Sequence, residues 1–447
     1  MDFFRAAIVA MAILGTAGVS CGGGNGGGRD VVPDDASAPD MPDRQDEQAD
    51  PPPDRPLDQP PDLEAEETDD DPVEDADEAE EEGCTAAGPY GIDHQEPSCL
   101  VPYPGSLWTR PLPEDVMLHL APSSDAIAEC TLTDRGNVEP QNYGHTDLAT
   151  PGPDDWNSFP RYYGNAADPL YMLDDCGPDT GTFIRIPSGA CFSQSQDHGI
   201  YVWDQTSDRT LGMYRWGESG PMCLPPCSGM TEAEACPTLF SGHCGASSFT
   251  SGPAYADGVT RWGFGGDSLG NAPWSLQVRH LELMDGVILH PLIAVTKCTV
   301  DNAFPAAGIT YECSLMGEPT DDRPPTGALF FLDYQDAEID AMDLPAWQLP
   351  LVRAAARYGI YVSDTSAYEG TGLSLRFEGG GAYELAGTTS PVYDWLRTEG
   401  VNSWTMPGGA ERFALPFLAG LPDVVSHIHL ADECVARELA GLPDGCP

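Results

Sequence analysis

Thirteen cysteines lie between residues 84 and 446, and they constrain the fold of this 447-residue chain more than any other feature. In an exported protein, cysteines at this density form disulfides that hold short loops together. Neighbours along the chain suggest bonds of Cys84 with Cys99, Cys176 with Cys191, Cys298 with Cys313, and Cys434 with Cys446. Two more bonds are expected among Cys223, Cys227, Cys236 and Cys244, which leaves Cys130 over. Because spacing alone does not fix connectivity, each pair is a hypothesis.

The first 20 residues predict export. Arg5 precedes an apolar run from Ala6 to Ala17, and the small residues Gly-Val-Ser stand before Cys21. This order is typical of a secretory signal, and the run is too short to cross a bilayer. The sequence around Cys21 resembles the lipobox of bacterial lipoproteins, which implies cleavage after residue 20 and lipidation of Cys21. We therefore expect a lipid-anchored protein of the cell envelope, at the outer membrane or cell surface, with its folded domain outside the cytoplasm. An ordinary cleaved signal is the alternative.

Residues 21–83 predict a disordered tether. Cys21 is followed by a Gly-rich stretch, and residues 30–82 hold 24 acidic residues against Arg44 and Arg55, among many prolines. Such a segment cannot bury enough apolar area to offset its chain entropy, and its like charges extend it. The composition changes at Gly83 and Cys84, so residues 84–447 are expected to form a single folded ectodomain.

The charge of the whole chain is strongly negative, at −52, and much of it falls within the folded part. Nucleic acid and anionic lipid head groups are therefore poor partners. Solubility in a salty exterior explains the acidity, and cation binding is the sharper alternative, because carboxylate oxygens are the ligands that calcium prefers. No other cofactor is indicated.

Alternating apolar and polar residues predict several strands separated by Gly, Pro, Asp and Asn turns. These strands cover Thr182 to Ile186, His198 to Asp204, Leu276 to Leu283, Val287 to Thr296, Ala328 to Tyr334, Ile360 to Ser363, and Leu373 to Phe377. Helices are predicted from Leu349 to Tyr358, stopped by Gly359, and from Asp432 to Leu439. The expected fold is mainly β, a disulfide-stapled β-sandwich or jelly-roll with one or two short helices.

Four segments between Asp197 and Asp364 resemble a group of uncharacterised secreted bacterial proteins. They are Asp197-His-Gly-Ile-Tyr-Val-Trp-Asp204, Gly286-Val-Ile-Leu-His290, Pro324-Pro-Thr-Gly327, and Ala355-Ala-Arg-Tyr-Gly-Ile-Tyr-Val-Ser-Asp364. The resemblance marks His290, Asp204 and Asp364 as candidate site residues, and it implies no particular chemistry for them.

Residues 266–269, Gly-Asp-Ser-Leu, resemble the nucleophile block of GDSL-type ester hydrolases. The resemblance implies Ser268 as nucleophile, Asn402 in the oxyanion hole, and Asp423 with His427 as acid and base. The surrounding sequence does not alternate strands and helices as that family does. A four-residue match in a Gly-rich chain also fits a simple turn.

Other residues can be interpreted as metal ligands or sugar-binding groups. The cluster from Cys223 to Cys244 has donor types that suit zinc, although an oxidising exterior favours disulfides. His427-Ile-His429 places two imidazoles on one face of an extended segment, as metal sites sometimes do, although a surface strand is the simpler interpretation. Polysaccharide chemistry would need two carboxylates across a cleft and aromatic platforms. The candidates for these roles are Asp204, Glu218, Glu282, Asp364, Trp203, Trp216, Trp262 and Trp274.

Two classes of function therefore remain, beside a purely structural role as a component of the surface layer. A cell-surface binding module would present an acidic, aromatic surface to a glycan, a cation or a protein partner. The alternative is a secreted hydrolase or lyase acting on polysaccharide, with a GDSL-type esterase as a third candidate. An enzyme should bring His290 and two carboxylates into one concave pocket, whereas a binding module need not.

Overall fold

The computed structural model describes residues 105–446, except 135, 152–157, 175–178, 194–198, 215–222, 238–242, 249–268, 270–275, 307–312, 366–371 and 443–444. The signal segment, Cys21, the predicted tether, Cys84, Cys99, Cys176, His198, Glu218, Trp216, Trp262, Trp274, Ser268 and the side chain of Cys244 lie outside the described residues. The described residues belong to one compact unit. None of the helices among them has the length and apolar character needed to cross a membrane.

One five-stranded sheet, here called the β9 sheet, has the strand order β12-β9-β11-β10-β16. Its strands are β12 (Ser374–Leu375), β9 (Leu292–Thr296), β11 (Ile360–Thr365), β10 (Leu329–Leu332) and β16 (Ile428–Leu430). β9 and β11 are parallel, and the other neighbours are antiparallel. Every residue of β9 is buried, which means that both faces of the sheet are covered.

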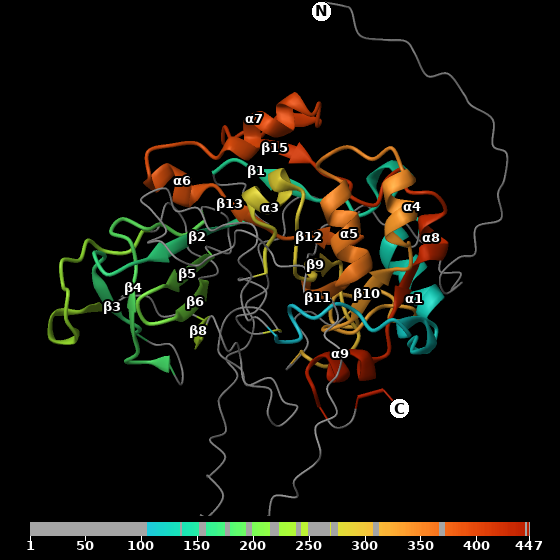
Figure 1. Cartoon of the computed structure of the whole chain (residues 1–447), viewed down its shortest axis with the longest axis horizontal. Coiled ribbons are helices and arrows are strands. Elements are labelled where there is room, and N and C mark those ends of the chain that lie inside the picture. Colours follow the sequence, from blue (N-terminus) through green and yellow to red (C-terminus); the bar gives the residue numbers. More distant parts are fainter. Residues whose placement is uncertain are drawn as a thin grey trace, which may run out of the picture. The chain divides into compact units, whose positions relative to one another are not determined.

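Helices contribute to the cores on both faces of the β9 sheet. Leu292 and Ala294 point into the core that holds α5 (Leu349–Arg357), and Ile293 between them points into the core that holds α9 (Glu433–Leu439). The first core also receives residues of α1 (Ser124–Thr133), α3 (His280–Asp285), α4 (Asp336–Ala341), α7 (Pro391–Thr398) and α8 (Val424–His427). In Figure 1, α4 and α5 lie beside β9, β10 and β11, and α9 lies at the lower end.

A second five-stranded sheet, the β5 sheet, has the order β13-β2-β5-β6-β8. Its strands are β13 (Phe377–Gly379), β2 (Ser158–Gly164), β5 (Ile200–Asp204), β6 (Arg209–Tyr214) and β8 (His243–Ser248). It shares a hydrophobic core with the three-stranded sheet of β4 (Phe183–Arg185), β3 (Leu170–Met172) and β7 (Cys236–Pro237).

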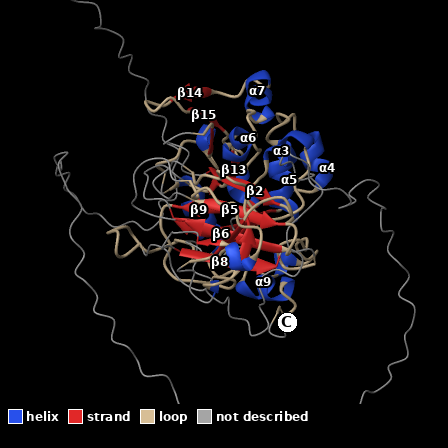
Figure 2. Ribbon diagram, turned by 90° about the vertical axis from the view of Figure 1, so that its left-hand side faces the viewer, coloured by secondary structure: helices blue, strands red, loops and turns tan. Residues whose placement is uncertain are grey.

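The remaining elements are short. A three-stranded sheet joins β1 (Asp147–Ala149), β15 (Glu411–Ala414) and β14 (Ser403–Thr405). α6 (Gly381–Leu385) follows β13, and short 3₁₀ turns form at η1 (Val116–Leu118), η2 (Pro140–Asn142) and η4 (Glu232–Glu234). Figure 2 shows the strands in the middle of the described part with helices around them.

The fold is mainly β, as expected, and the two predicted helices form as α5 and α9. The described residues hold more helices than the one or two expected. The predicted strand from Leu276 to Leu283 is wrong beyond Val278, because helix α3 begins at His280. Glu282 accepts a hydrogen bond from the backbone N–H of Arg279 at 2.9 Å, and this capping interaction starts the helix.

Four disulfides are present among the described cysteines. Cys298–Cys313 and Cys434–Cys446 confirm the prediction, and Cys227–Cys236 is one of the two bonds expected in its cluster. The predicted bond of Cys191 with Cys176 is wrong, as is a bond of Cys223 within its own cluster, because Cys191 is bonded to Cys223. An antiparallel bridge between these two residues brings them together across 32 positions of sequence. Cys130, which the predicted pairing leaves over, is buried in α1.

Substitution of the glycine after α5 tests how closely the end of this helix packs against the β9 sheet. Gly359 has φ +83°, and a Cβ there would lie 2.5 Å from Leu329 Cδ1 and 2.9 Å from Phe330 O. Gly286, after α3, has φ +73° and open space around that position. We predict that Gly359→Ala lowers the free energy of unfolding in urea by roughly 2–4 kcal/mol, whereas Gly286→Ala costs only the backbone strain of about 1 kcal/mol. Equal losses in the two variants would contradict this account.

Candidate functional site

The predicted candidate His290 is fully buried and belongs to a cluster of charged side chains. Its Nδ1 lies 2.8 Å from the carbonyl oxygen of Pro291, and its Nε2 lies 3.3 Å from Glu282 Oε2. The same carboxylate is ion-paired with the buried Arg279 guanidinium. The described cavities are lined by other residues, so His290 holds α3 to the start of β9 rather than facing a ligand.

The electrostatics of this cluster favour the ionised carboxylate. Burial alone would raise the pKa of Glu282, but the charges of Arg279 and His290 and their hydrogen bonds outweigh it. The pKa of Glu282 is therefore held well below its usual range. A carboxylate in this state neither donates a proton nor accepts one at ordinary pH, so we assign it a structural role.

Asp204 is a turn residue of the β5–β6 hairpin. Its carboxylate accepts hydrogen bonds from the Thr206 backbone N–H at 2.9 Å, the Ser207 hydroxyl at 2.7 Å and the Arg185 backbone N–H at 2.9 Å. Such bonds from a short side chain to the following backbone are what stabilises tight turns. Asp204 thereby also joins the hairpin to β4.

Asp364 lies on β11 and is ion-paired with Arg376. Across the sheet it stands opposite Val295 of β9, which is five residues beyond His290. Each of the three candidates thus has partners of its own: His290 contacts Pro291 and Glu282, Asp204 contacts its own turn in the β5 sheet, and Asp364 contacts Arg376 beside the β9 sheet.

The structure instead brings together His427, His429 and Asp333 at the edge of the β9 sheet. Asp333 directly follows β10, and its backbone N–H donates to the His427 carbonyl at 3.1 Å. One oxygen of its carboxylate contacts His427 Nδ1, and the other lies 3.4 Å from His429 Nε2. The histidine pair thus has an acidic partner in space that lies 94 and 96 positions away in the sequence.

His429 is 8% exposed and forms no hydrogen bond through either ring nitrogen. Besides Asp333, its nearest charged neighbour is Asp125 of α1, whose Oδ1 lies 3.5 Å from Nδ1. The imidazole lines a cavity of about 600 Å³, a size that suits small-molecule ligands. A buried polar side chain without hydrogen bonds, facing a cavity, is the strongest sign of a binding site among the described residues.

The cavity is acidic and partly apolar. Glu129 lies one helical turn beyond Asp125 on α1, and Asp423 stands directly before α8. The apolar part of the wall is formed by Pro140, Leu418, Leu421, Val424 and Val425. Burial raises the pKa of Tyr143, which also lines the cavity, and the charges of Glu129 and Glu139 raise it further. This phenol therefore stays a neutral hydrogen-bond donor beside the carboxylates.

The acid–base pair of Asp423 and His427 that the esterase resemblance implies does not form. His427 contacts Asp333 rather than Asp423, and its ring stacks on Tyr334 at 4.2 Å between centroids. Among the described residues, the only group of three donors close enough for one metal ion is His119, Cys434 and Cys446. The described carboxylates of the cavity at His429 do not form such a group of three.

A second buried histidine, His280, was not singled out from the sequence. Its Nδ1 lies 2.7 Å from Ser390 Oγ, and its ring stacks against Tyr383. A serine beside a histidine suggests a nucleophile, but both are buried and no described cavity reaches them. Ser390 Oγ also accepts from the Val392 backbone N–H, so it is the N-cap of α7.

Comparisons of the sequence with protein families and with curated proteins, and of the structure with solved structures, find no match. The function must therefore be argued from the geometry of the site.

His280 generates a prediction about acid stability. Burial lowers its pKa to about 3 in the folded protein, whereas an unfolded chain should show about 6.5. As the pH falls, the unfolded state therefore takes up the proton before the folded state does. The contribution of the neutral His280 side chain to the free energy of unfolding is complete above pH 6.5 and is lost as the pH falls. We predict that the gap in unfolding free energy between wild type and His280→Asn shrinks by about 2 kcal/mol from pH 6.5 to pH 5, measured by urea unfolding. A gap that stays constant over this range would show that His280 does not titrate in this way.

Proposed function

We propose that this protein is a cell-surface lipoprotein whose ectodomain is a binding module, and that the cavity at His429 takes an extended organic cation. The observation that carries the proposal is the buried imidazole of His429 in a cavity lined by Asp125, Glu129 and Asp423. Its ring nitrogens form no hydrogen bond and lie 3.4 and 3.5 Å from the carboxylates of Asp333 and Asp125. Negative charge converging on a concave surface attracts cations and raises their local concentration.

The chemistry of the wall favours an alkylammonium group over a metal ion. A metal ion needs several donors within a few ångströms of one point, and the described carboxylates of this cavity do not form such a group. Leucine and valine side chains between them offer a surface for methylene groups. A polyamine or a lysine side chain of a protein partner has both features, and calcium is the competing cation that the acidity of the chain suggests.

The hydrophobic core that the β5 sheet shares with the three-stranded sheet of β4, β3 and β7 supports the part of the proposal that treats the ectodomain as a β-sandwich binding domain. Lipidation of Cys21 and the acidic segment of residues 21–83 complete the proposal. They would hold the domain away from the envelope surface, where it can meet ligands in the medium. The jelly-roll form of the fold has no comparable support.

The enzyme alternative has weaker support from the residues on which it was based. A polysaccharide hydrolase or lyase was expected to gather His290 with two carboxylates in one concave pocket. The structure places one candidate carboxylate, Glu282, 3.3 Å from His290, but both side chains are fully buried, and Asp204 and Asp364 have partners of their own. The contact of Asp333 with His429 could orient a general base, but the carboxylates of the cavity wall would oppose the negative charge of the enolate that a lyase forms. We therefore propose binding rather than catalysis.

The proposal is tested by calorimetric titration of the full chain with spermidine at physiological salt. Asp125→Asn/Asp423→Asn should weaken binding tenfold or more, because each carboxylate supplies a charge-assisted contact of about 1.5–3 kcal/mol. Asp343→Asn/Glu399→Gln is the matched control, since it removes two exposed charges outside the cavity and should leave the affinity within twofold.

Two further titrations identify the source of the cation. Tighter binding of a lysine-containing peptide than of spermidine would point to a protein partner, and tighter binding of Ca²⁺ would replace the organic cation by a metal. Equal weakening in the two double variants would contradict the proposal, because it would show that spermidine senses only the net charge.

A further inference from the structure

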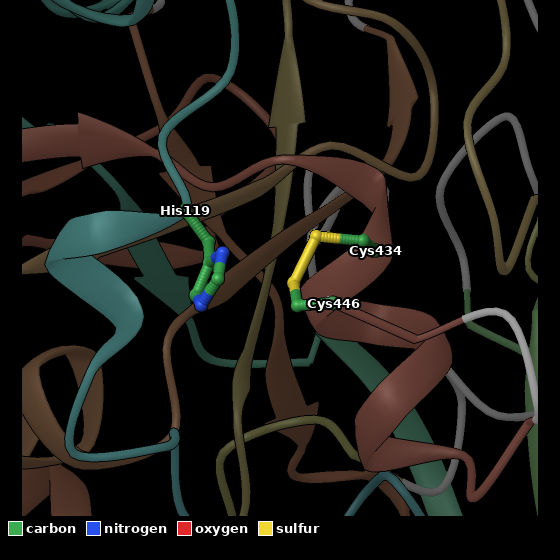
Figure 3. Close-up of side chains that lie close together, drawn as sticks. All are labelled: His119, Cys434 and Cys446. Atoms are coloured by element: carbon green, nitrogen blue, oxygen red, sulfur yellow. A yellow bond between two sulfur atoms is a disulfide. The ribbon is translucent and has the colours of Figure 1, made fainter.

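Figure 3 shows His119 beside the disulfide between Cys434 and Cys446. One ring nitrogen of His119 and the two sulfur atoms lie within 4.8 Å of one another. All three residues are partly exposed, which distinguishes this disulfide from the fully buried Cys298–Cys313. Reducing agents reach partly exposed disulfides far more readily than buried ones.

We propose that reduction of the Cys434–Cys446 disulfide creates a site for a thiophilic divalent cation such as Zn²⁺, with His119 as the third ligand. Two thiolates and one imidazole are a donor set that suits zinc, and a water molecule would complete the tetrahedron.

The chemistry balances with a dithiol as the reductant. One thiolate of the dithiol attacks a sulfur of the disulfide, and its second thiol resolves the mixed disulfide. The dithiol leaves as its own disulfide, having given two electrons and two protons to Cys434 and Cys446. Binding of Zn²⁺ then releases the two thiol protons, and the neutral imidazole of His119 binds through a lone pair.

The position of His119 does not depend on the disulfide. Its carbonyl accepts a hydrogen bond from the Asp432 backbone N–H at 2.8 Å, two residues before Cys434. The next residue, Leu120, forms a bridge with Ala431, and Ala121 N–H donates to Leu430 O at 2.9 Å. The backbone around residues 119–121 is therefore fixed to the segment that leads into α9, so His119 and Cys434 stay together when the sulfur bond opens.

Asp115 supports the histidine as a ligand. Its Oδ2 lies 3.6 Å from His119 Nε2, four residues before it in the chain. A carboxylate beside one ring nitrogen favours the proton there and leaves the lone pair on the other nitrogen, an arrangement common around metal-bound histidines.

The test uses the full chain, reduced with dithiothreitol, freed of reagent without oxygen and titrated with Co²⁺. Thiolate ligation gives Co²⁺ a charge-transfer absorption in the near ultraviolet, and Zn²⁺ should then displace it. We expect His119→Ala to weaken Co²⁺ binding tenfold or more, and Cys434→Ser/Cys446→Ser to remove this site. Cys227→Ser/Cys236→Ser removes another partly buried disulfide, which has no histidine of the described residues in such a cluster, and should leave the affinity unchanged.

Three results would overturn the proposal. They are the absence of thiolate-bound Co²⁺ in the reduced wild type, equal binding in His119→Ala and wild type, and loss of the near-ultraviolet circular dichroism of the fold on reduction. The last would show that the three donors separate before a metal can bind. The oxidised chain serves as the baseline, since its disulfide offers no thiolate.

Discussion

Residues 374–379 pass from one five-stranded sheet to the other and are hydrogen-bonded to both. The arrangement of the rest of the fold depends on this segment, here called the crossing. β12 pairs with β9, and after a single residue β13 pairs with β2. That single residue, Arg376, is ion-paired with Asp364 on one side and lies over the Phe159 ring on the other, at 5.3 Å. Two sheets that share one strand segment cannot shift independently, because a change of register in one moves the pairing in the other.

Charged side chains are buried around this crossing. Glu378 accepts a hydrogen bond from the His280 backbone N–H at 3.0 Å, and Arg279, Glu282 and His290 lie on the segment that runs beside it. Buried ion pairs add little net stability, but removal of one partner is costly, so they select one arrangement strongly. This explains why His290 has a structural role, although an imidazole is chemically suited to catalysis. The crossing occupies the β12 edge of the β9 sheet, and the cavity at His429 lies at the opposite β16 edge.

The sequence predicted the local features of the fold better than the long-range ones. Alternation located β4, β5, β10 and β11, and the Ala- and Arg-rich run before Gly359 located α5, because these patterns are properties of short segments. Helix α1 was not predicted, since its apolar residues do not form a clear stripe. The bond between Cys191 and Cys223 was also missed, because it depends on a bridge that no local pattern encodes.

For the candidate site, too, the sequence predicted local features better than long-range contacts. His427 and His429 were recognised as a pair, but their acidic partner comes from the end of a different strand. Asp333 follows the predicted strand from Ala328 to Tyr334, yet only the antiparallel pairing of β10 with β16 places it between the two histidines. Asp125 and Glu129 have helical spacing that could be read from the sequence, once α1 is known to be a helix. The pairing of β10 with β16 is therefore the step that converts scattered residues into a site.

The central claim is that an organic cation binds beside His429 rather than along the acidic segment of residues 30–82. The most direct measurement is photocrosslinking of the full chain with a diazirine-bearing alkylamine, followed by mass-spectrometric mapping of the labelled peptides. The account predicts labelling of peptides that contain residues 121–129 and 418–429, suppressed by excess spermidine. Labelling confined to residues 30–82, or spread evenly over acidic peptides, would contradict it.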